Sequence, residues 1–171
     1  MSFIGTGVEY GLHCLLHLVD ESDEGAHAGV RALAELQGVS GEYLAKLFTK
    51  LAKAELVVAA EGAGGGYRLA RPADRITVHD VVVAIEGDKS FFDCREIRSR
   101  CAVFDDRPPG WATRGVCSIH AVMQTAEKAM RDELKRHTLA DLAERTDKKA
   151  PAAYKGQVVA WLSDRAASRR S

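Results

Sequence analysis

The chain carries no excess of charge, because its 24 lysines and arginines are matched by 24 aspartates and glutamates. This balance excludes the generally basic coat of many nucleic-acid-binding proteins, so any attraction to DNA must come from the local placement of cations. The sequence also lacks internal repeats, an apolar run of bilayer length and a basic leader region in its first ten residues. We therefore expect a cytoplasmic protein without membrane contact.

Cysteine is scarce, with four residues in the chain. In a cytoplasmic protein they are expected to be reduced thiols, metal ligands or redox sensors, and not structural disulfides. Cys94, Cys101 and Cys117 lie in or beside residues 87–115, where regular pattern fades. A long irregular segment in a compact protein is usually functional or disordered, and three gathered cysteines favour a function. Cys14 is assigned to packing.

Residues 40–71 predict a two-faced helix followed by a glycine-tipped hairpin. Apolar and basic residues recur on separate faces at helical spacing, namely Leu44, Leu47, Phe48 and Leu51 against Lys46, Lys50 and Lys53. Ser40 stands at the expected N-cap, and a glycine-rich turn at 61–66 joins two short strands. Ser40, Glu42 and Tyr43 would meet base edges or backbone, and the lysines would attract phosphates. A solvated helix with a flexible hairpin is the plainer alternative.

The flanking patterns complete a winged helix-turn-helix. A helix at 7–20 carries Glu9, His13 and His17 at intervals of four, close enough to share a metal ion or simply to hydrogen-bond one another. A short helix at 30–36 precedes the two-faced one, and Thr77 caps a helix that ends at Glu86. We predict a mainly α fold with a small β-hairpin wing, whose two-faced helix enters the major groove of DNA.

The longest periodic run begins at Ser118. Its apolar stripe exceeds what the core needs and suggests pairing with a second copy; it consists of Ile119, Val122, Met123, Ala126, Met130 and Leu134. Thr138 and Asp141 have capping-box spacing for a following short helix. The predicted organisation is a DNA-binding domain at 1–86, a cysteine-bearing sensor loop at 87–117, a dimerisation helix with a short following helix at 118–146, and a tail at 147–171. The apolar residues of the tail are expected to dock.

Two motifs resemble the IscR and NsrR type of bacterial winged-helix repressors, the Rrf-two family, over about residues 5–143. They are LQGVSGEYLAKLFTKLAKAELV, which matches the recognition helix, and EGAGGGYRLARPADRITVHDVVVAIEG, which matches the wing and the next helix. The resemblance implies a homodimer on an inverted-repeat operator in double-stranded DNA. It points to Ser40, Glu42, Tyr43, Lys46 and Arg68 as contacts, with Lys50 and Lys53 as phosphate contacts or merely exposed residues.

The resemblance also implies an iron-sulfur cluster. Many family members hold one through three loop cysteines, here Cys94, Cys101 and Cys117, although six and fifteen residues separate them, a looser spacing than that of IscR and NsrR. The N-terminal GVEYGLHC is similar to the member RsrR, in which a glutamate and a histidine matching Glu9 and His13 ligate a [2Fe-2S] cluster together with partner cysteines. His120 matches a histidine ligand of IscR and competes as the fourth ligand. Which cysteines participate stays open.

These features leave three candidate functions. The first is a repressor controlled by a [2Fe-2S] cluster that responds to redox state, nitric oxide or cluster supply. The second is a cluster-free regulator of the same family that uses a thiol switch, or a metabolite or partner signal. The third, a cysteine-dependent enzyme with His120 or His13 as base, lacks a recognisable oxyanion site or substrate pocket. We therefore predict that the protein is not an enzyme and takes no small-molecule substrate.

Overall fold

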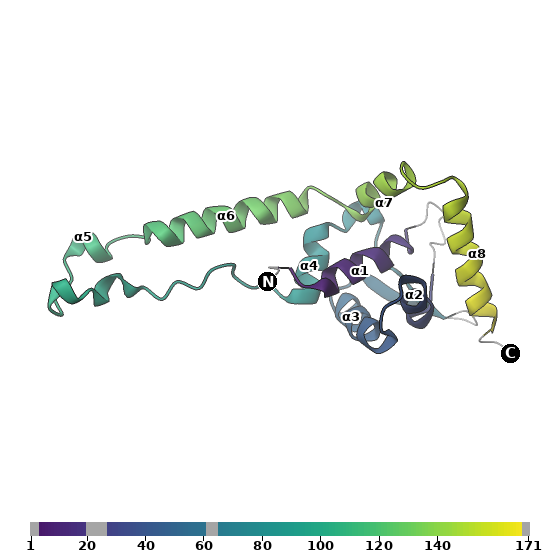
Figure 1. Cartoon of the computed structure of the whole chain (residues 1–171), viewed down its shortest axis with the longest axis horizontal. Helices are drawn as coiled ribbons and strands as arrows, with labels where there is room; N and C mark the ends of the chain where they lie inside the picture. Colours follow the sequence, from purple (N-terminus) through teal and green to yellow (C-terminus); the bar gives the residue numbers. More distant parts are fainter. Residues whose placement is uncertain (1–3, 20–26, 61–64, 169–171) are drawn as a thin grey trace. The chain divides into compact units, whose positions relative to one another are not determined.

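The computed structural model describes residues 4–19, 27–60 and 65–168. They divide into two compact units, one of residues 1–88 and 134–171 and one of residues 89–133. Within the described residues the fold is mainly helical with one two-stranded antiparallel sheet, which confirms the predicted class (Figure 1). Among these residues no helix is long and apolar enough to span a bilayer.

The first unit has the order helix, helix-turn-helix, wing, helix. Its elements are α1 (Thr6–Leu16), α2 (Val30–Gln37), α3 (Gly41–Lys53), β1 (Val57–Ala60), β2 (Gly66–Leu69), η1 (Ala73–Arg75), α4 (Val78–Glu86), α7 (Leu139–Asp147) and α8 (Ala153–Ser168). The second unit holds η2 (Ile97–Arg100), η3 (Ala102–Phe104), α5 (Gly110–Thr113) and most of α6 (Ser118–Lys135).

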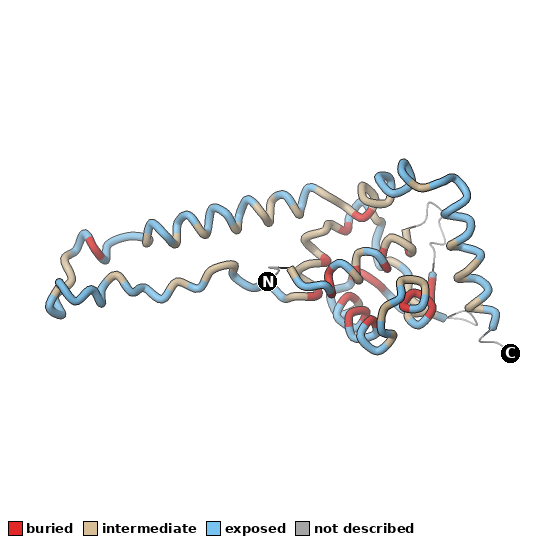
Figure 2. Tube along the Cα trace, viewed as in Figure 1, coloured by how far each residue is buried: buried red, intermediate tan, exposed pale blue. Residues whose placement is uncertain are grey.

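The hydrophobic core lies in the first unit. Fully buried side chains come from α1 to α4, from the turns between them and from the start of α7, and include Leu15, Leu33, Phe48, Leu51 and Leu139. Figure 2 shows buried residues concentrated in this unit, whereas the described part of the second unit is mostly exposed. The winged helix therefore has its own core, and the segment that carries the loop cysteines does not contribute to it.

The wing is hydrogen-bonded to the segment before α2. Ala28 and Tyr67 form a bridge with N–O distances of 3.1 and 2.9 Å. Gly66 has a φ of +157°, and a Cβ added there would lie 2.5 Å from the Ala28 carbonyl, so only glycine fits this approach. Residues 61–64 of the predicted turn lie outside the described residues.

Helix α7 is tied to the start of α4 by backbone bonds. Val78 N donates to His137 O at 2.8 Å, and Leu139 N donates to Ile76 O at 2.9 Å. The predicted caps are present, because Thr77 with Asp80 and Thr138 with Asp141 form complete capping boxes.

These caps allow a first test. Thr138→Ala should lower the free energy of unfolding by about 1 kcal/mol, because the amide of Asp141 loses its acceptor. Urea denaturation followed by circular dichroism measures this change. Thr146→Ala is the matched control, since the exposed Thr146 hydroxyl bonds only Leu142 O within α7. Equal effects of the two substitutions would contradict the capping role.

The C-terminal segment contains a helix that its sequence pattern did not predict. Helix α8 contacts α2, where Arg165 donates to both carboxylate oxygens of Glu35 at 2.8 to 3.2 Å and stacks on Trp161. Leu162 packs against the core as expected, but Val159 is 57% exposed and does not dock. Helix α8 has a weak amphipathic pattern and no buried residue, so the Arg165–Glu35 pair and the packing of Leu162 hold it in place of a continuous apolar stripe.

Candidate nucleic-acid interface and metal site

Helix α3 presents a polar outer face above a buried inner one. Leu44, Leu47, Phe48 and Leu51 are buried, as their spacing predicted, and this fixes the direction of the remaining side chains. Glu42 and Lys46 are exposed on the other side. Lys46 has no hydrogen bond or ion pair to any residue that the structure describes, so its ammonium is available to an outside anion.

The first turn of α3 is held by its cap and by an aromatic contact. Ser40 Oγ accepts from Tyr43 N at 3.4 Å. The Tyr43 ring meets Tyr10 of α1 edge to face with centroids 6.1 Å apart, while the residue is 41% exposed. The predicted contact residues Ser40 and Tyr43 are therefore exposed and also structurally anchored, which limits the positions their side chains can take.

Lys50 differs from Lys46 although both lie on the basic stripe. Lys50 Nζ donates to Ile85 O at 2.6 Å and so caps the C-terminal end of α4. Lys50 also lines an open pocket of about 610 Å³ between the ends of α3 and α4. One of the three lysines whose spacing predicted phosphate attraction is therefore bonded to a carbonyl of its own domain.

A groove separates the start of α3 from the wing. It has a volume of about 900 Å³ and is lined by Arg31 of α2, Ser40 and Glu42 at the start of α3, and Tyr67 of β2. Arg68, beside it on the wing, is exposed, and the one bond of its guanidinium to a described residue is to the neighbouring Leu69 carbonyl at 3.3 Å. Arg31 was not among the predicted contacts, because one arginine at a helix start carries no distinguishing pattern.

Helix α1 exposes both of its candidate ligands. Glu9 and His13 are exposed on its surface, whereas His17 bonds Gln37 at 2.6 Å, and burial followed by the charge of His13 lowers the pKa of His17. Cys14 is completely buried, and burial raises the pKa of its thiol to about 12. This confirms its assignment to packing and leaves it a poor metal ligand.

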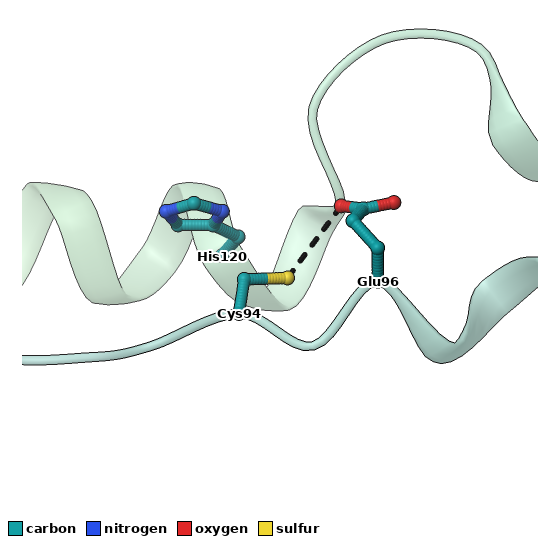
Figure 3. A group of neighbouring side chains, drawn as sticks. All are labelled: Cys94, Glu96 and His120. Carbon is teal, nitrogen blue, oxygen red and sulfur yellow. Dashed lines mark hydrogen bonds between the residues drawn. The ribbon is translucent and has the colours of Figure 1, made fainter.

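In the second unit, Cys94, Glu96 and His120 come together (Figure 3). Their ligand atoms all lie within 4.8 Å of one another, and Cys94 Sγ lies 3.5 Å from Glu96 Oε1. The His120 ring meets Phe92 edge to face with centroids 5.9 Å apart. A thiol, a carboxylate and an imidazole at this separation are suitable donors for a transition metal.

Arg98 holds the carboxylate of Glu96 in place by hydrogen bonds. Its guanidinium donates to Glu96 Oε2 at 2.7 and 3.2 Å and to Gly115 O at 2.9 Å. The hydrogen bond from Arg98 is the largest cause that holds the pKa of Glu96 below its ordinary value, so the carboxylate stays ionised. Arg98 thus joins the start of the segment to the residues just before α6.

The other two loop cysteines lie outside this group. Cys101 is exposed between η2 and η3, and Cys117 is half-buried immediately before α6. Sequence reasoning expected Cys94 and His120 as ligands but missed Glu96. The available signal was weak, since a glutamate two residues after a cysteine is common in exposed segments.

A family model described as "Rrf2: Iron-dependent Transcriptional regulator" matches residues 4–145. The chain belongs to the Rrf2 (Rrf-two) family. The curated protein rrf2 of Nitratidesulfovibrio vulgaris (strain Hildenborough) is 34% identical over 137 residues, which cover 80% of this chain and 84% of the relative. Two solved structures are also similar.

The structure of CymR, the global cysteine regulator of B. subtilis, is 27% identical with a TM-score of 0.66 and covers 86% of this chain and all of that one. The structure of T. potens IscR is 26% identical with a TM-score of 0.65 and covers 88% and 93% of the two chains. Rrf2 regulators bind DNA and typically dimerise. This Rrf2 chain is accordingly a winged-helix transcriptional regulator and not an enzyme, as predicted.

The donor chemistry of the second unit fits the iron that the Rrf2 family description names. Cys94 and His120 lie together, and both are half-buried, so an ion or cluster can reach them. Soft thiolates and imidazole are the ligands that iron-sulfur centres use.

Proposed function

We propose that the chain is a dimeric DNA-binding repressor whose operator affinity is controlled by an iron-sulfur cluster of the [2Fe-2S] type. One observation carries the proposal. The outer face of α3 is exposed, and the second unit brings the thiol of Cys94 and the imidazole of His120 within 4.8 Å of each other, in one chain of an iron-dependent regulator family. Redox state, nitric oxide or cluster supply would be the signal.

At the DNA end, α3 would enter the major groove and the wing would lie against a neighbouring groove or phosphates. The proposed contacts are Ser40, Glu42, Tyr43, Lys46, Lys50 and Arg68. Lys46 and Arg68 would attract phosphates, since both are exposed. Lys50 would contribute less, because the Ile85 carbonyl already occupies its ammonium.

Dimerisation would use α6. Ile119 and Val122 are 62% and 65% exposed, and no residue of α6 is buried in the single chain. An apolar stripe of this length on a soluble domain usually pairs with another surface. Two copies related by two-fold symmetry would present two α3 helices to an inverted repeat.

The cluster would be held by ligands from Glu9, His13, Cys94, Cys101 and Cys117, with His120 as the competing ligand. When bound, it would supply one-electron redox chemistry. The chain's own part is to hold these donors on two elements, α1 and the cysteine-bearing segment. If the two elements come from different protomers, the ligand positions depend on how the protomers are arranged, and so does the separation of the α3 helices.

The DNA contacts can be tested by single substitutions. Lys46→Ala and Arg68→Ala should each weaken operator binding severalfold, because each removes a cation that neutralises a phosphate. Each should also lower the slope of log affinity against log salt by about 1 for every phosphate that is no longer neutralised. Fluorescence anisotropy with a duplex identified by footprinting on the chain's own promoter region measures both.

Lys155→Ala on α8 is the matched control, because this exposed lysine lies outside the proposed interface. It should leave both the affinity and the salt slope unchanged. Loss of helicity in parallel with loss of binding would identify α3 as a structural helix and not a reading one.

A cluster-free thiol switch is the second candidate. The exposed Cys101 favours it, as does the likeness to CymR, which is named as a cysteine regulator. Anaerobically purified protein that contains no iron or sulfide, yet loses operator binding on treatment with peroxide, would support this alternative over the cluster.

A further inference from the structure

We propose that Cys94, Glu96 and His120 of one protomer bind a single divalent transition-metal ion, Zn²⁺ or Fe²⁺, without any ligand from the partner. This site shares Cys94 and His120 with the proposed cluster, so the two are alternative metal-bound forms. The mononuclear form differs because it uses Glu96 and needs neither sulfide nor α1. It would give the sensor segment a metal-bound form in the absence of a cluster.

The spacing of the donors carries the inference. In a tetrahedral site with a metal–sulfur distance of about 2.3 Å and a metal–oxygen distance of about 2.0 Å, the two ligand atoms lie about 3.5 Å apart. Cys94 Sγ and Glu96 Oε1 are separated by 3.5 Å. The His120 nitrogen lies within 4.8 Å of both, so a modest side-chain rotation completes a three-ligand site.

Glu96 is prepared for this role by its surroundings. Arg98 binds the Oε2 atom of Glu96. The Oε1 atom is thereby left directed at Cys94, as Figure 3 shows. Groups behind a ligand commonly fix its orientation in this way, and their loss weakens metal binding. Glu96 also has a φ of +46°, a left-handed conformation that disfavours residues other than glycine, and this turn brings its side chain back toward Cys94.

Charge and ligand type favour a borderline divalent ion. A thiolate and a carboxylate together neutralise a 2+ ion, and imidazole adds a neutral donor. Ca²⁺ and Mg²⁺ would be rejected, because they require oxygen ligands. Since Glu96 is exposed, water can occupy the fourth position.

Cobalt provides a direct readout. The full-length chain, reduced and freed of metal under anaerobic conditions, should be titrated with Co²⁺ while the near-ultraviolet thiolate-to-cobalt band and the visible bands of tetrahedral cobalt are recorded. We expect one ion per chain. Cys94→Ser should abolish the charge-transfer band. Arg98→Gln, which removes an outer-shell partner, should weaken binding about 10- to 100-fold, and Glu96→Gln, which removes a charged ligand, should weaken it at least as much.

Cys101→Ser is the matched control, since this exposed thiol lies outside the group and its removal should leave the titration unchanged. Circular dichroism of each variant verifies folding. An absent charge-transfer band in the parent protein would overturn the proposal. It would also be overturned if Cys101→Ser weakened binding as much as Glu96→Gln.

Reconstitution with iron and sulfide separates this inference from the cluster function. If the Glu96→Gln variant takes up a cluster normally but binds Co²⁺ weakly, the result supports both proposals. If the parent protein binds cobalt but takes up no cluster, the result supports the mononuclear site and excludes the cluster proposal. If both proteins take up a cluster, and Glu96→Gln binds cobalt as tightly as the parent, the mononuclear site is excluded and the cluster proposal stands.

Discussion

Phe48→Ala should lower the free energy of unfolding by about 3–5 kcal/mol, because it leaves a cavity in the centre of the winged-helix core. The side chain is fully buried and contacts the Tyr67 ring with centroids 5.2 Å apart, so it joins α3 to the wing. Operator binding should fall together with stability, since α3, the helix proposed to enter the major groove, loses its support. Urea denaturation followed by circular dichroism measures the effect.

Phe92→Ala is the control for this prediction. Phe92 is only half-buried and lies in the second unit, against His120. The same atoms are removed, but less apolar surface returns to water, so the loss of stability should be clearly smaller. If both variants lost the same amount, the core would extend beyond the residues that the structure buries.

The double substitution Cys94→Ser and Cys117→Ser should abolish the visible iron-sulfur absorbance of anaerobically reconstituted protein. It should also remove the dependence of operator affinity on redox state, because serine does not replace thiolate at iron. Neither cysteine belongs to the core, so the melting temperature should change little. Absorbance spectroscopy, iron and sulfide analysis and anisotropy provide the measurements.

Thr113→Ala in α5 is the matched control within the same segment, because it removes an exposed side chain that is no metal donor. It should retain colour and response. A colourless, iron-free parent protein would exclude the cluster, and full colour in the double variant would place the ligands elsewhere.

Much of the DNA-binding half was predictable from residues that are close in sequence. The alternation of Leu47 and Phe48 with Lys46 defines the two faces of α3, and Ser40 marks its start. The capping boxes at Thr77 and Thr138 were likewise local signals. Local propensity and local hydrogen bonds determine such features before any long-range contact forms.

The metal-binding candidate was predictable only in part. Cys94 and His120 were expected ligands, but Glu96 gained its position from Arg98, whose second contact is to Gly115 seventeen residues later. No periodicity relates these residues, so their meeting depends on the path of an irregular chain. The same holds for α8, which a salt bridge between Arg165 and Glu35 attaches across 130 residues.

The sequence by itself determined a winged helix whose second helix of the helix-turn-helix has an apolar and a basic face, a cysteine-bearing segment and a long apolar-striped helix. Only the tertiary structure decided that Lys50 bonds the Ile85 carbonyl while Lys46 has no such bond to the described residues, and that a carboxylate joins Cys94 and His120. The physical reason is the separation along the sequence over which each kind of interaction acts. Helical and hairpin patterns depend on neighbours a few residues away, whereas a hydrogen bond or ligand set between distant residues depends on where packing brings the backbone.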